Sequence, residues 1–283
     1  MPMIAVIGAG PLGGAVARAL ALRSRIREVR LVDPDGTVAE GKALDIGQSA
    51  PIEQFATRIT GAGSIAAAGG ADAIVLADLA GSGEISGENG LALLRRLARL
   101  EGAAPFVCGG GTQRELMMRG RTELAIAAGR LIGSAPLALE SAVTAVVAAL
   151  VDVSPNDLSI GIAGVPPGHV AIGWQAATAF HQPIANVLAP HQMAAVSSRL
   201  AALWPPSPYT LASAAARVAE AAALGSRRRY TCFACLDGAG ERGGVVAAVP
   251  VVVSRGGIGR VLEPALSRHE RTAFENGLRE PPN

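Results

Sequence analysis

A glycine-rich turn near the start of the sequence places the strongest constraint on the fold. Residues 4–20 read IAVIGAGPLGGAVARAL, in which a short apolar run enters the turn and small or apolar residues follow it. Gly8, Gly10 and Gly13 have the spacing G-x-G-x-x-G. The first glycine permits a tight turn, the second allows a pyrophosphate to approach the backbone, and the third lets helix and strand pack closely. The stretch therefore predicts a strand, a phosphate-binding turn and a helix, in that order.

A second predicted strand ends on a carboxylate. Residues 28–33 (EVRLVD) form this strand and end on Asp33. A carboxylate at this place accepts hydrogen bonds from both ribose hydroxyls of NAD and repels the additional phosphate of NADP. We therefore predict that NAD is bound, with the following candidate contacts in this part of the chain: Gly8, Gly10, Pro11, Leu12, Gly13 and Asp33. In the alternative interpretation the glycines form only a tight turn, and Asp33 is only a solvated strand end.

Alternation of strand-like and helix-like segments predicts the fold class of the first half. Strands are expected at residues 4–8, 28–33, 72–78 and 105–109, and helices at 11–22, 38–50 and 90–101. Strands that alternate with helices form a parallel sheet with helical crossovers. We predict an α/β chain whose residues 1–136 form a dinucleotide-binding domain built on a doubly wound parallel sheet.

The pattern becomes mixed after residue 136. Strands are expected at residues 157–164, 169–174, 228–236 and 243–254, and helices at 137–151, 190–203, 209–224 and 267–278. Pro166, Pro167 and Gly168 separate the first two of these strands and predict a hairpin. Residues 137–283 are therefore expected to form a mixed α+β domain that carries the substrate and catalytic site.

Composition and cysteine spacing exclude several classes of function. The net charge of +2 gives no electrostatic footprint for nucleic acid or for a membrane surface. The chain shows no signal-peptide pattern and no membrane-spanning run, so we expect a cytoplasmic protein. Cys232 and Cys235 form a C-x-x-C, but neither a second pair nor a nearby histidine accompanies it. We predict no metal site.

Two longer stretches resemble the malate and lactate dehydrogenases. LVDPDGTVAEGKALDIGQSAP, which begins at residue 31, follows the glycine turn as it does in that family. The closing stretch GGVVAAVPVVVSRGGIGRVLEPALSRHERTAF, from residue 243, is also similar. The resemblance implies a Rossmann-type domain followed by a substrate domain. It also implies a homo-oligomer, a dimer or a tetramer, with Lys42 to Ile46 near a subunit contact.

The residues that carry the family reaction are not found at the matching positions. The family uses a histidine to exchange the hydroxyl proton, an aspartate to orient it, and two arginines to hold the substrate. Here Pro167 stands in the place of the histidine, Glu140 in that of the aspartate, and Val143 in that of the carboxylate-binding arginine. His169 lies one or two places late and is the alternative base. We keep open the use of a more distant histidine, His181 or His191.

Departures also occur around the cofactor and in the family's mobile loop. The loop, residues 79–90, contains Glu84 and Glu88 but no arginine or lysine, and its charges would oppose an anionic substrate. Gly110 or Gly111 stands where the family has an asparagine that places the nicotinamide ribose, and we count Gly110 among the cofactor contacts. Asp78 replaces a small neutral residue beside the cofactor. A carboxylate there is unfavourable unless it points away from the pyrophosphate or binds a ribose hydroxyl.

These observations lead to one prediction with an alternative. The chain is expected to be a dehydrogenase-like oxidoreductase-family protein that binds NAD(H) but lacks the standard catalytic set, so its catalytic residues are unknown. The alternative is a non-catalytic NAD-binding or scaffolding homo-oligomer. Arg114, Arg119 and Arg121 are candidates for binding an anion, although solvated helix arginines are the simpler interpretation.

Overall fold

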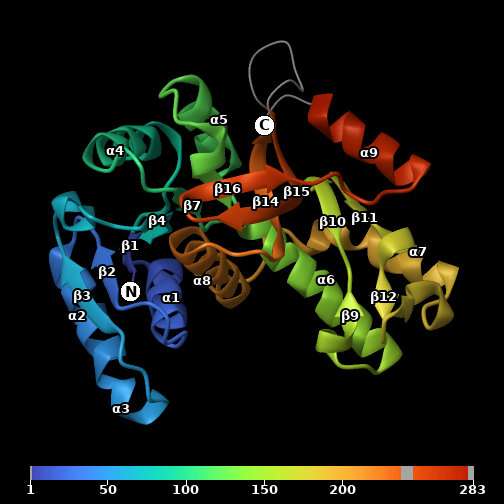
Figure 1. The fold of residues 1–283 in the computed structure, drawn as a ribbon, viewed down its shortest axis with the longest axis horizontal. Helices are drawn as coiled ribbons and strands as arrows, with labels where there is room; N and C mark the ends of the chain where they lie inside the picture. The colour runs from blue at the N-terminus through green and yellow to red at the C-terminus, as the bar shows by residue number, and fades with distance from the viewer. Residues whose placement is uncertain (1, 237–244, 280–283) are drawn as a thin grey trace.

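The computed structural model describes residues 2–236 and 245–279 (Figure 1). Six parallel strands form the first half of the main sheet, in the order β3-β2-β1-β4-β7-β8. They are β1 (Met3–Ile7), β2 (Glu28–Val32), β3 (Arg58–Ala62), β4 (Ala73–Leu76), β7 (Phe106–Cys108) and β8 (Leu131–Gly133). Ile7 lies level with Val32 on one side and Leu76 on the other, so the three strands end together. The predicted parallel sheet is confirmed.

Helices cover both faces of these strands. They are α1 (Pro11–Ala21), α2 (Gly36–Gln48), α3 (Ala50–Glu53), α4 (Gly87–Leu100) and α5 (Arg114–Thr122). Figure 1 shows α4 and α5 together above the strands, with α1 and α8 (Pro208–Leu224) below them. Helix α8 comes from the second half of the chain, so the two halves share one layer.

The second half extends the same sheet with antiparallel strands. Strand β14 (Arg229–Leu236) pairs with β8, and β15 (Val245–Ser254) pairs with β14, β16 (Gly257–Val261) and β10 (Ile162–Val165). Strand β11 (His169–Ile172) closes the edge as a hairpin with β10, as predicted. The remaining helices are α6 (Ala135–Val151), α7 (Pro190–Ser198) and α9 (Arg268–Arg279).

Two small sheets and several single turns of helix complete the chain. One sheet contains β9 (Leu158–Ser159), β12 (Thr178–Ala179) and β13 (Gln182–Pro183), and the other contains β5 (Asp78–Leu79) and β6 (Gly83–Glu84). Short 3-10 turns cover Ile65–Ala68, Ala128–Arg130, Pro155–Asp157, Trp174–Ala176, Ile184–Asn186 and Leu200–Leu203.

Some predicted elements differ from the observed ones. The single strand expected at 157–164 is wrong, because β9 and β10 belong to different sheets. The strand expected at 72–78 ends at Leu76, and Asp78 opens a separate hairpin. The helix expected at 190–203 ends at Ser198 and continues as a 3-10 turn. The domain boundary at residue 136 falls in the first turn of α6 and stays a prediction.

Small apolar side chains build the core. Aromatic residues make up only 3% of the chain, and α8 buries a face of alanines, among them Ala215, Ala216, Ala219 and Ala222. Small side chains allow α8 to lie close to α1 and to the sheet. A second apolar cluster surrounds α6 and β10. Among the described residues, no helix has the length and apolar character needed to cross a membrane.

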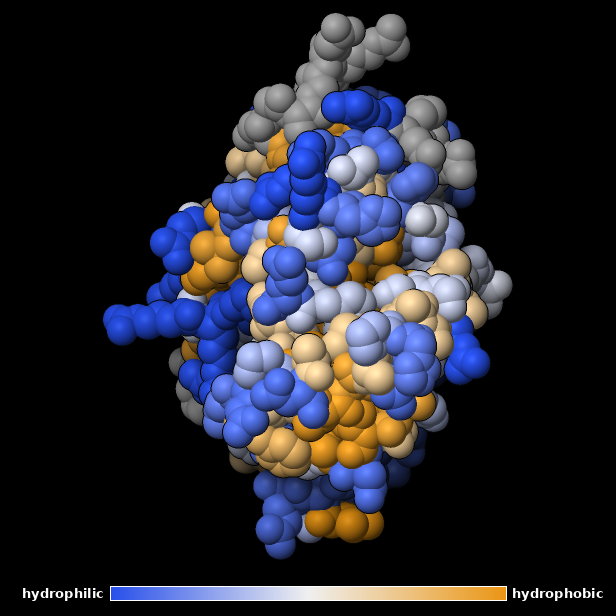
Figure 2. Space-filling model, turned by 90° about the vertical axis from the view of Figure 1, so that its right-hand side faces the viewer, coloured by the Kyte–Doolittle hydropathy of each residue, from blue (hydrophilic) through white to orange (hydrophobic). Residues whose placement is uncertain are grey.

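Figure 2 shows the side of the molecule that carries α7 and α9, where apolar residues form orange areas among polar ones. In the segment between β12 and α7, Phe180 and Val187 are exposed large apolar residues. On the opposite side of Figure 1, Leu44 of α2 and Ile52 of α3 are also exposed. Single exposed apolar side chains are normal on protein surfaces, and only their grouping carries an argument.

Candidate functional site

The glycine turn lies between β1 and α1 and is packed too tightly for side chains. Gly8 has a φ of +104°, which favours glycine, and a Cβ there would lie 2.2 Å from the Asp78 carbonyl oxygen. A Cβ on Gly13 would lie 1.9 Å from the Gly8 oxygen. The predicted roles of the first and third glycines, a tight turn and close packing, therefore have a direct steric basis.

Asp33 follows β2 and lies beside this turn, only 2% exposed. Its Oδ2 accepts hydrogen bonds from the backbone N–H of Ala9 at 2.7 Å and of Ala80 at 2.9 Å. Its Oδ1 accepts one from the N–H of Asp35 at 2.9 Å. Asp33 stands where the sequence predicted, but three backbone donors already engage the carboxylate that was expected to bind ribose hydroxyls.

Asp78 engages the donors of the glycine turn and of the first turn of α1. Its backbone oxygen accepts from Gly10 N–H at 2.8 Å, and its carboxylate accepts from Leu12 N–H at 3.1 Å and Gly13 N–H at 2.7 Å. Pro11 has no N–H. A Cβ on Gly10 would lie 2.4 Å from the Asp78 carboxylate, so the absence of a side chain there makes room for that carboxylate. A negative charge is favoured at a helix N-terminus, and here the chain supplies it itself.

A second carboxylate, that of Glu84 in β6, contacts the loop between β7 and α5. Glu84 accepts hydrogen bonds from Gly111 N–H at 3.0 Å, from Thr112 N–H at 2.8 Å and from the Thr112 hydroxyl at 2.6 Å. A Cβ on Gly110 would lie 2.3 Å from Glu84 Oε2. Gly110, a predicted cofactor contact, therefore lies beneath the Glu84 side chain. Nothing in the sequence pattern predicted this contact, because residues 79–90 were expected to form a mobile loop.

Both carboxylates belong to one short hairpin, which we call the carboxylate hairpin (residues 77–85). Asp78 and Glu84 are paired opposite each other across β5 and β6. Gln113, which is 1% exposed, donates from Nε2 to the backbone oxygens of Ala77 and Ile85 at 3.2 and 3.1 Å. One amide side chain therefore holds both ends of the hairpin.

One cationic side chain reaches the glycine turn. Lys42 of α2 donates from Nζ to the Gly10 backbone oxygen at 2.9 Å. An ammonium group beside a helix N-terminus favours a phosphate or a carboxylate at that place. Lys42 was expected only to lie near a subunit contact, and its contact with the glycine turn becomes visible only in the structure.

The positions that the resemblance assigns to catalysis lie in the second half. Pro167 forms the turn between β10 and β11, and Val143 is fully buried in the apolar cluster around α6. His169 begins β11, and α9 packs against it, since a Cβ on Gly277 would lie 2.5 Å from the His169 Cβ. His181 lies in the turn between β12 and β13, and His191 lies in α7.

Glu140 of α6 carries a largely buried carboxyl group, with 14% of its side chain exposed. It accepts a hydrogen bond from the Thr231 hydroxyl, and its Oε1 lies 3.8 Å from an Arg229 nitrogen. Burial raises the pKa of Glu140, and the contacts with Thr231 and Arg229 oppose this effect only in part. The protonated form is therefore favoured more than in an exposed glutamate.

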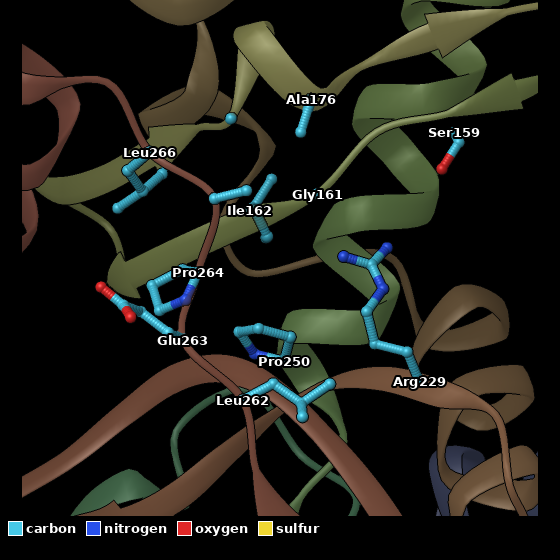
Figure 3. A pocket seen from close by; sticks show the side chains of 12 residues that line it. Ser159, Gly161, Ile162, Ala176, Arg229, Pro250, Leu262, Glu263, Pro264 and Leu266 are labelled. Atoms are coloured by element: carbon cyan, nitrogen blue, oxygen red, sulfur yellow. The ribbon is translucent and has the colours of Figure 1, made fainter. Parts of the chain in front are cut away.

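Arg229 also lines a small pocket of about 180 Å³. Figure 3 shows its guanidinium pointing toward Gly161, with Pro250, Leu262 and Pro264 on the other walls. Ligand pockets for drug-sized molecules usually measure about 300–1,000 Å³. This pocket is therefore too small for a dinucleotide.

The remaining candidates are engaged in structural contacts. Arg114 donates to the Val246 backbone oxygen at 2.8 Å, and Arg119 pairs with Glu88 and Glu123 at 2.8 and 2.6 Å. The three cysteines are buried and form no disulfide. Burial raises the pKa of the Cys108 thiol to about 12, which keeps it protonated near neutral pH. Within residues 2–236 and 245–279, no cluster of three or more metal-ligating side chains occurs.

The turn at the ends of β1, β2 and β4 has the glycine spacing for a dinucleotide, but its N–H donors are already engaged. The glycines allow close approach, and the N-terminus of α1 favours an anion. However, the N–H groups of Gly10, Leu12 and Gly13 all donate to Asp78. With the carboxylate hairpin in this position, a pyrophosphate would meet a carboxylate instead of hydrogen-bond donors.

Comparison with known proteins gives consistent similarities. Residues 3–100 match the model of the lactate/malate dehydrogenase NAD-binding domain. The chain is 28% identical to a malate dehydrogenase of Roseobacter denitrificans, over 98% of this chain and 93% of the relative. It is 29% identical to one of Thioalkalivibrio sulfidiphilus, over 98% and 96%. The malate dehydrogenase structure from Salinibacter ruber superposes with a TM-score of 0.85 at 22% identity, over 97% and 93% of the two chains. The Cryptosporidium parvum lactate dehydrogenase also gives 0.85, at 19% identity, over 98% and 95%.

Proposed function

We propose that this chain, a member of the lactate and malate dehydrogenase family, binds NAD(H) in its Rossmann-fold domain but lacks ordinary dehydrogenase activity. Nicotinamide cofactors supply hydride transfer, while the protein contributes binding, orientation and proton exchange. We expect the chain to retain the residues that bind the cofactor and to lack those that exchange the proton.

The observation that carries the proposal is the chemistry of two positions. Pro167 has no ionisable group, and the buried Val143 side chain lies among apolar residues. A general base contributes about two to four powers of ten to a rate, and a carboxylate is best held by a two-pronged cation. With both groups absent, the binding of a 2-hydroxy acid and its deprotonation lose their usual partners.

The residues proposed to hold the cofactor surround the glycine turn. Gly8, Gly10, Pro11, Leu12 and Gly13 would face the pyrophosphate, Asp33 the adenosine ribose, and Gly110 the nicotinamide ribose. Their support is their common position at one edge of the parallel sheet. Lys42 joins this set, because its ammonium group lies on the turn itself.

We further propose that the chain forms a homo-oligomer through α2 and α3. Leu44, which is 63% exposed, lies in the segment that the resemblance places near a subunit contact, and Ile52, which is 84% exposed, lies on the adjoining helix α3. Burying such side chains between subunits is favourable by about 1.5–3 kcal/mol each when burial is complete. A cytoplasmic location stays a prediction from the sequence.

Turnover assays test the proposal. The wild-type chain is incubated with NADH and oxaloacetate or pyruvate, and with NAD and malate or lactate, while absorbance of the reduced nicotinamide is followed. We expect no turnover above a buffer blank. The same assays on Asp78→Ala, which frees the N–H groups of Leu12 and Gly13, ensure that weak cofactor binding does not hide an active site. Ordinary turnover in either chain would overturn the proposal.

Two alternatives have their own discriminating measurements. If the chain were a scaffold that no longer uses its cofactor, millimolar NADH would leave the melting temperature of both wild type and Asp78→Ala unchanged, since only a bound ligand stabilises the folded state. If His169 were a substitute base, the wild type would turn over and His169→Ala would not. Retained turnover in His169→Ala would direct attention to His181 and His191.

A further inference from the structure

We propose that the carboxylate hairpin occupies the expected cofactor site, and that NAD(H) must displace the hairpin in order to bind. Asp78 and Glu84 are then the residues that set the affinity for the cofactor. This inference rests on the NAD-binding part of the proposed function, and it concerns a conformational step rather than catalysis.

The hairpin and a pyrophosphate compete for the same hydrogen-bond donors. Gly10, Leu12 and Gly13 offer the N–H groups that a pyrophosphate would use, and each donates to Asp78. The other N–H groups of the turn are also engaged: Gly8 donates to Val32, Ala9 to Asp33, and Gly14 to Gly10. A pyrophosphate therefore has to replace the Asp78 carboxylate. The two anions cannot share the site, because like charges at contact distance repel strongly away from water.

The hairpin contacts three places where the cofactor is expected. Ala80 N–H donates to Asp33, as a ribose hydroxyl would. Asp78 lies at the N-terminus of α1, as a pyrophosphate would. Glu84 covers Gly110 and accepts from Gly111 and Thr112, at the loop expected to face the nicotinamide ribose. Agreement at all three points indicates that the hairpin follows the path of the dinucleotide.

The hairpin is able to move as a unit. Strands β5 and β6 have two residues each and form a sheet separate from the main one. An isolated two-stranded hairpin is at best marginally stable. Gly81 and Gly83 have positive φ and residues 81–83 are exposed, so the tip is held by little packing. Gln113 holds both ends at Ala77 and Ile85, which defines where the segment would bend.

The affinity test uses isothermal titration of NADH, ADP and adenosine into wild type, Asp78→Ala and Glu84→Ala. The apparent affinity of a ligand falls in proportion to the population of the open state. We expect Asp78→Ala to bind NADH and ADP at least about tenfold more tightly than the wild type. Glu84→Ala should also tighten the binding of both NADH and ADP, because loss of the Glu84 hydrogen bonds raises the population of the open hairpin.

Two controls separate the proposed effect from general ones. Glu275→Ala removes an exposed carboxylate from α9 and should leave all three affinities unchanged. This variant controls for the change in net charge, which is the same as in Asp78→Ala. In Asp78→Ala, adenosine gains only from the larger open population, so its gain should be smaller than that of ADP, whose phosphates also no longer meet the Asp78 carboxylate. An equal gain for adenosine would show that Asp78 does not act at the pyrophosphate position.

Hydrogen exchange measured by mass spectrometry tests the movement itself in the wild-type chain. Saturating NADH should slow exchange in residues 8–14 and accelerate it in residues 79–84, since the displaced hairpin loses its hydrogen bonds. An ordinary pocket would show protection of both segments. This measurement needs no variant, and it therefore stands even if Asp78→Ala, which removes an anion from a helix N-terminus, does not fold.

The proposal is overturned if Asp78→Ala and Glu84→Ala bind NADH no more tightly than the wild type, or if NADH protects the hairpin. These outcomes differ from a failure of the proposed function. Turnover of malate or lactate would refute that function and leave the displacement of the hairpin intact. Absence of NADH binding by every variant would refute both.

Discussion

Asp33 shows how a residue expected to bind a ligand can also organise the apo fold. Its carboxylate joins the N–H groups of Ala9, Asp35 and Ala80, and thereby links the glycine turn to the carboxylate hairpin. Each buried donor left without a partner costs about 1–3 kcal/mol. The residue therefore matters for stability before any cofactor is present.

We predict that Asp33→Ala lowers the free energy of unfolding by about 3 kcal/mol in the absence of nucleotide. Urea denaturation followed by circular dichroism measures this change. The matched control is Asp35→Ala, which removes only the exposed side-chain cap of α2 and should cost about 1 kcal/mol. Equal small losses in the two variants would mean that solvent replaces the Asp33 contacts.

Glu140 predicts a pH dependence. Because burial raises its pKa in the folded chain, the folded state binds the proton more tightly than the unfolded state. Its contribution to stability is therefore present below the ordinary carboxyl pKa and decreases as the pH rises through the raised value. Glu140→Gln keeps a hydrogen-bond acceptor for Thr231 and removes this dependence.

The measurement is the melting temperature of wild type and Glu140→Gln from about pH 4 to about pH 8. We expect the melting temperature of Glu140→Gln to increase relative to that of the wild type as the pH rises. At the acid end the two melting temperatures should converge. Glu275→Gln, an exposed carboxyl on α9, should follow the wild type at every pH. A constant difference between Glu140→Gln and the wild type would contradict the prediction.

At the scale of elements, an ion pair links α8 to the segment that follows α1. Glu220 of α8 is buried, and it contacts Arg23 at 3.3 Å and Arg25 at 3.0 Å. Burial lowers the pKa of Arg23, which shows that its charge is partly desolvated. The helix from the second half of the chain is thereby fixed beside the helix that follows the glycine turn.

We predict that Glu220→Ala destabilises the chain by about 2 kcal/mol, because it leaves Arg23 partly buried without its partner. The figure lies below the usual range for buried pairs, since Arg25 is 66% exposed and solvent screens it. Glu263→Ala, which breaks the exposed pair with Arg271, should change stability by less than about 1 kcal/mol. Urea denaturation compares the two, and equal losses would show that burial of Glu220 contributes nothing.

Periodicity predicted most elements but not their ends or their partners. The helices around residues 11–22 and 209–224 were found close to the expected bounds, because long runs of small apolar residues have few alternatives. The carboxylate hairpin was expected to be a mobile loop. Its conformation depends on hydrogen bonds to α1, Gln113 and Thr112, which are distant in sequence and carry no periodic signal.

For the whole molecule, we predict that the exposed apolar residues of α2 and α3 lie in a subunit contact. Sedimentation velocity should show a dimer or a larger species for the wild type. Leu44→Glu combined with Ile52→Glu should give a monomer, because charges buried at an interface are strongly unfavourable. Phe180→Glu, on the opposite side, is the control and should leave the assembly unchanged. A monomeric wild type would refute this contact.

The sequence by itself determined the α/β fold class, the family and the position of the glycine turn. These depend on local spacing and on the order of segments, which can be read along the chain. Only the tertiary structure decided which groups meet at the ends of the parallel strands. There Asp78 accepts hydrogen bonds from N–H groups in the first turn of α1, up to sixty-six residues away in the chain. Glu84 accepts hydrogen bonds from N–H groups of the loop before α5. A hydrogen bond needs both partners in place, and sequence spacing alone cannot specify a partner that folding brings from another segment.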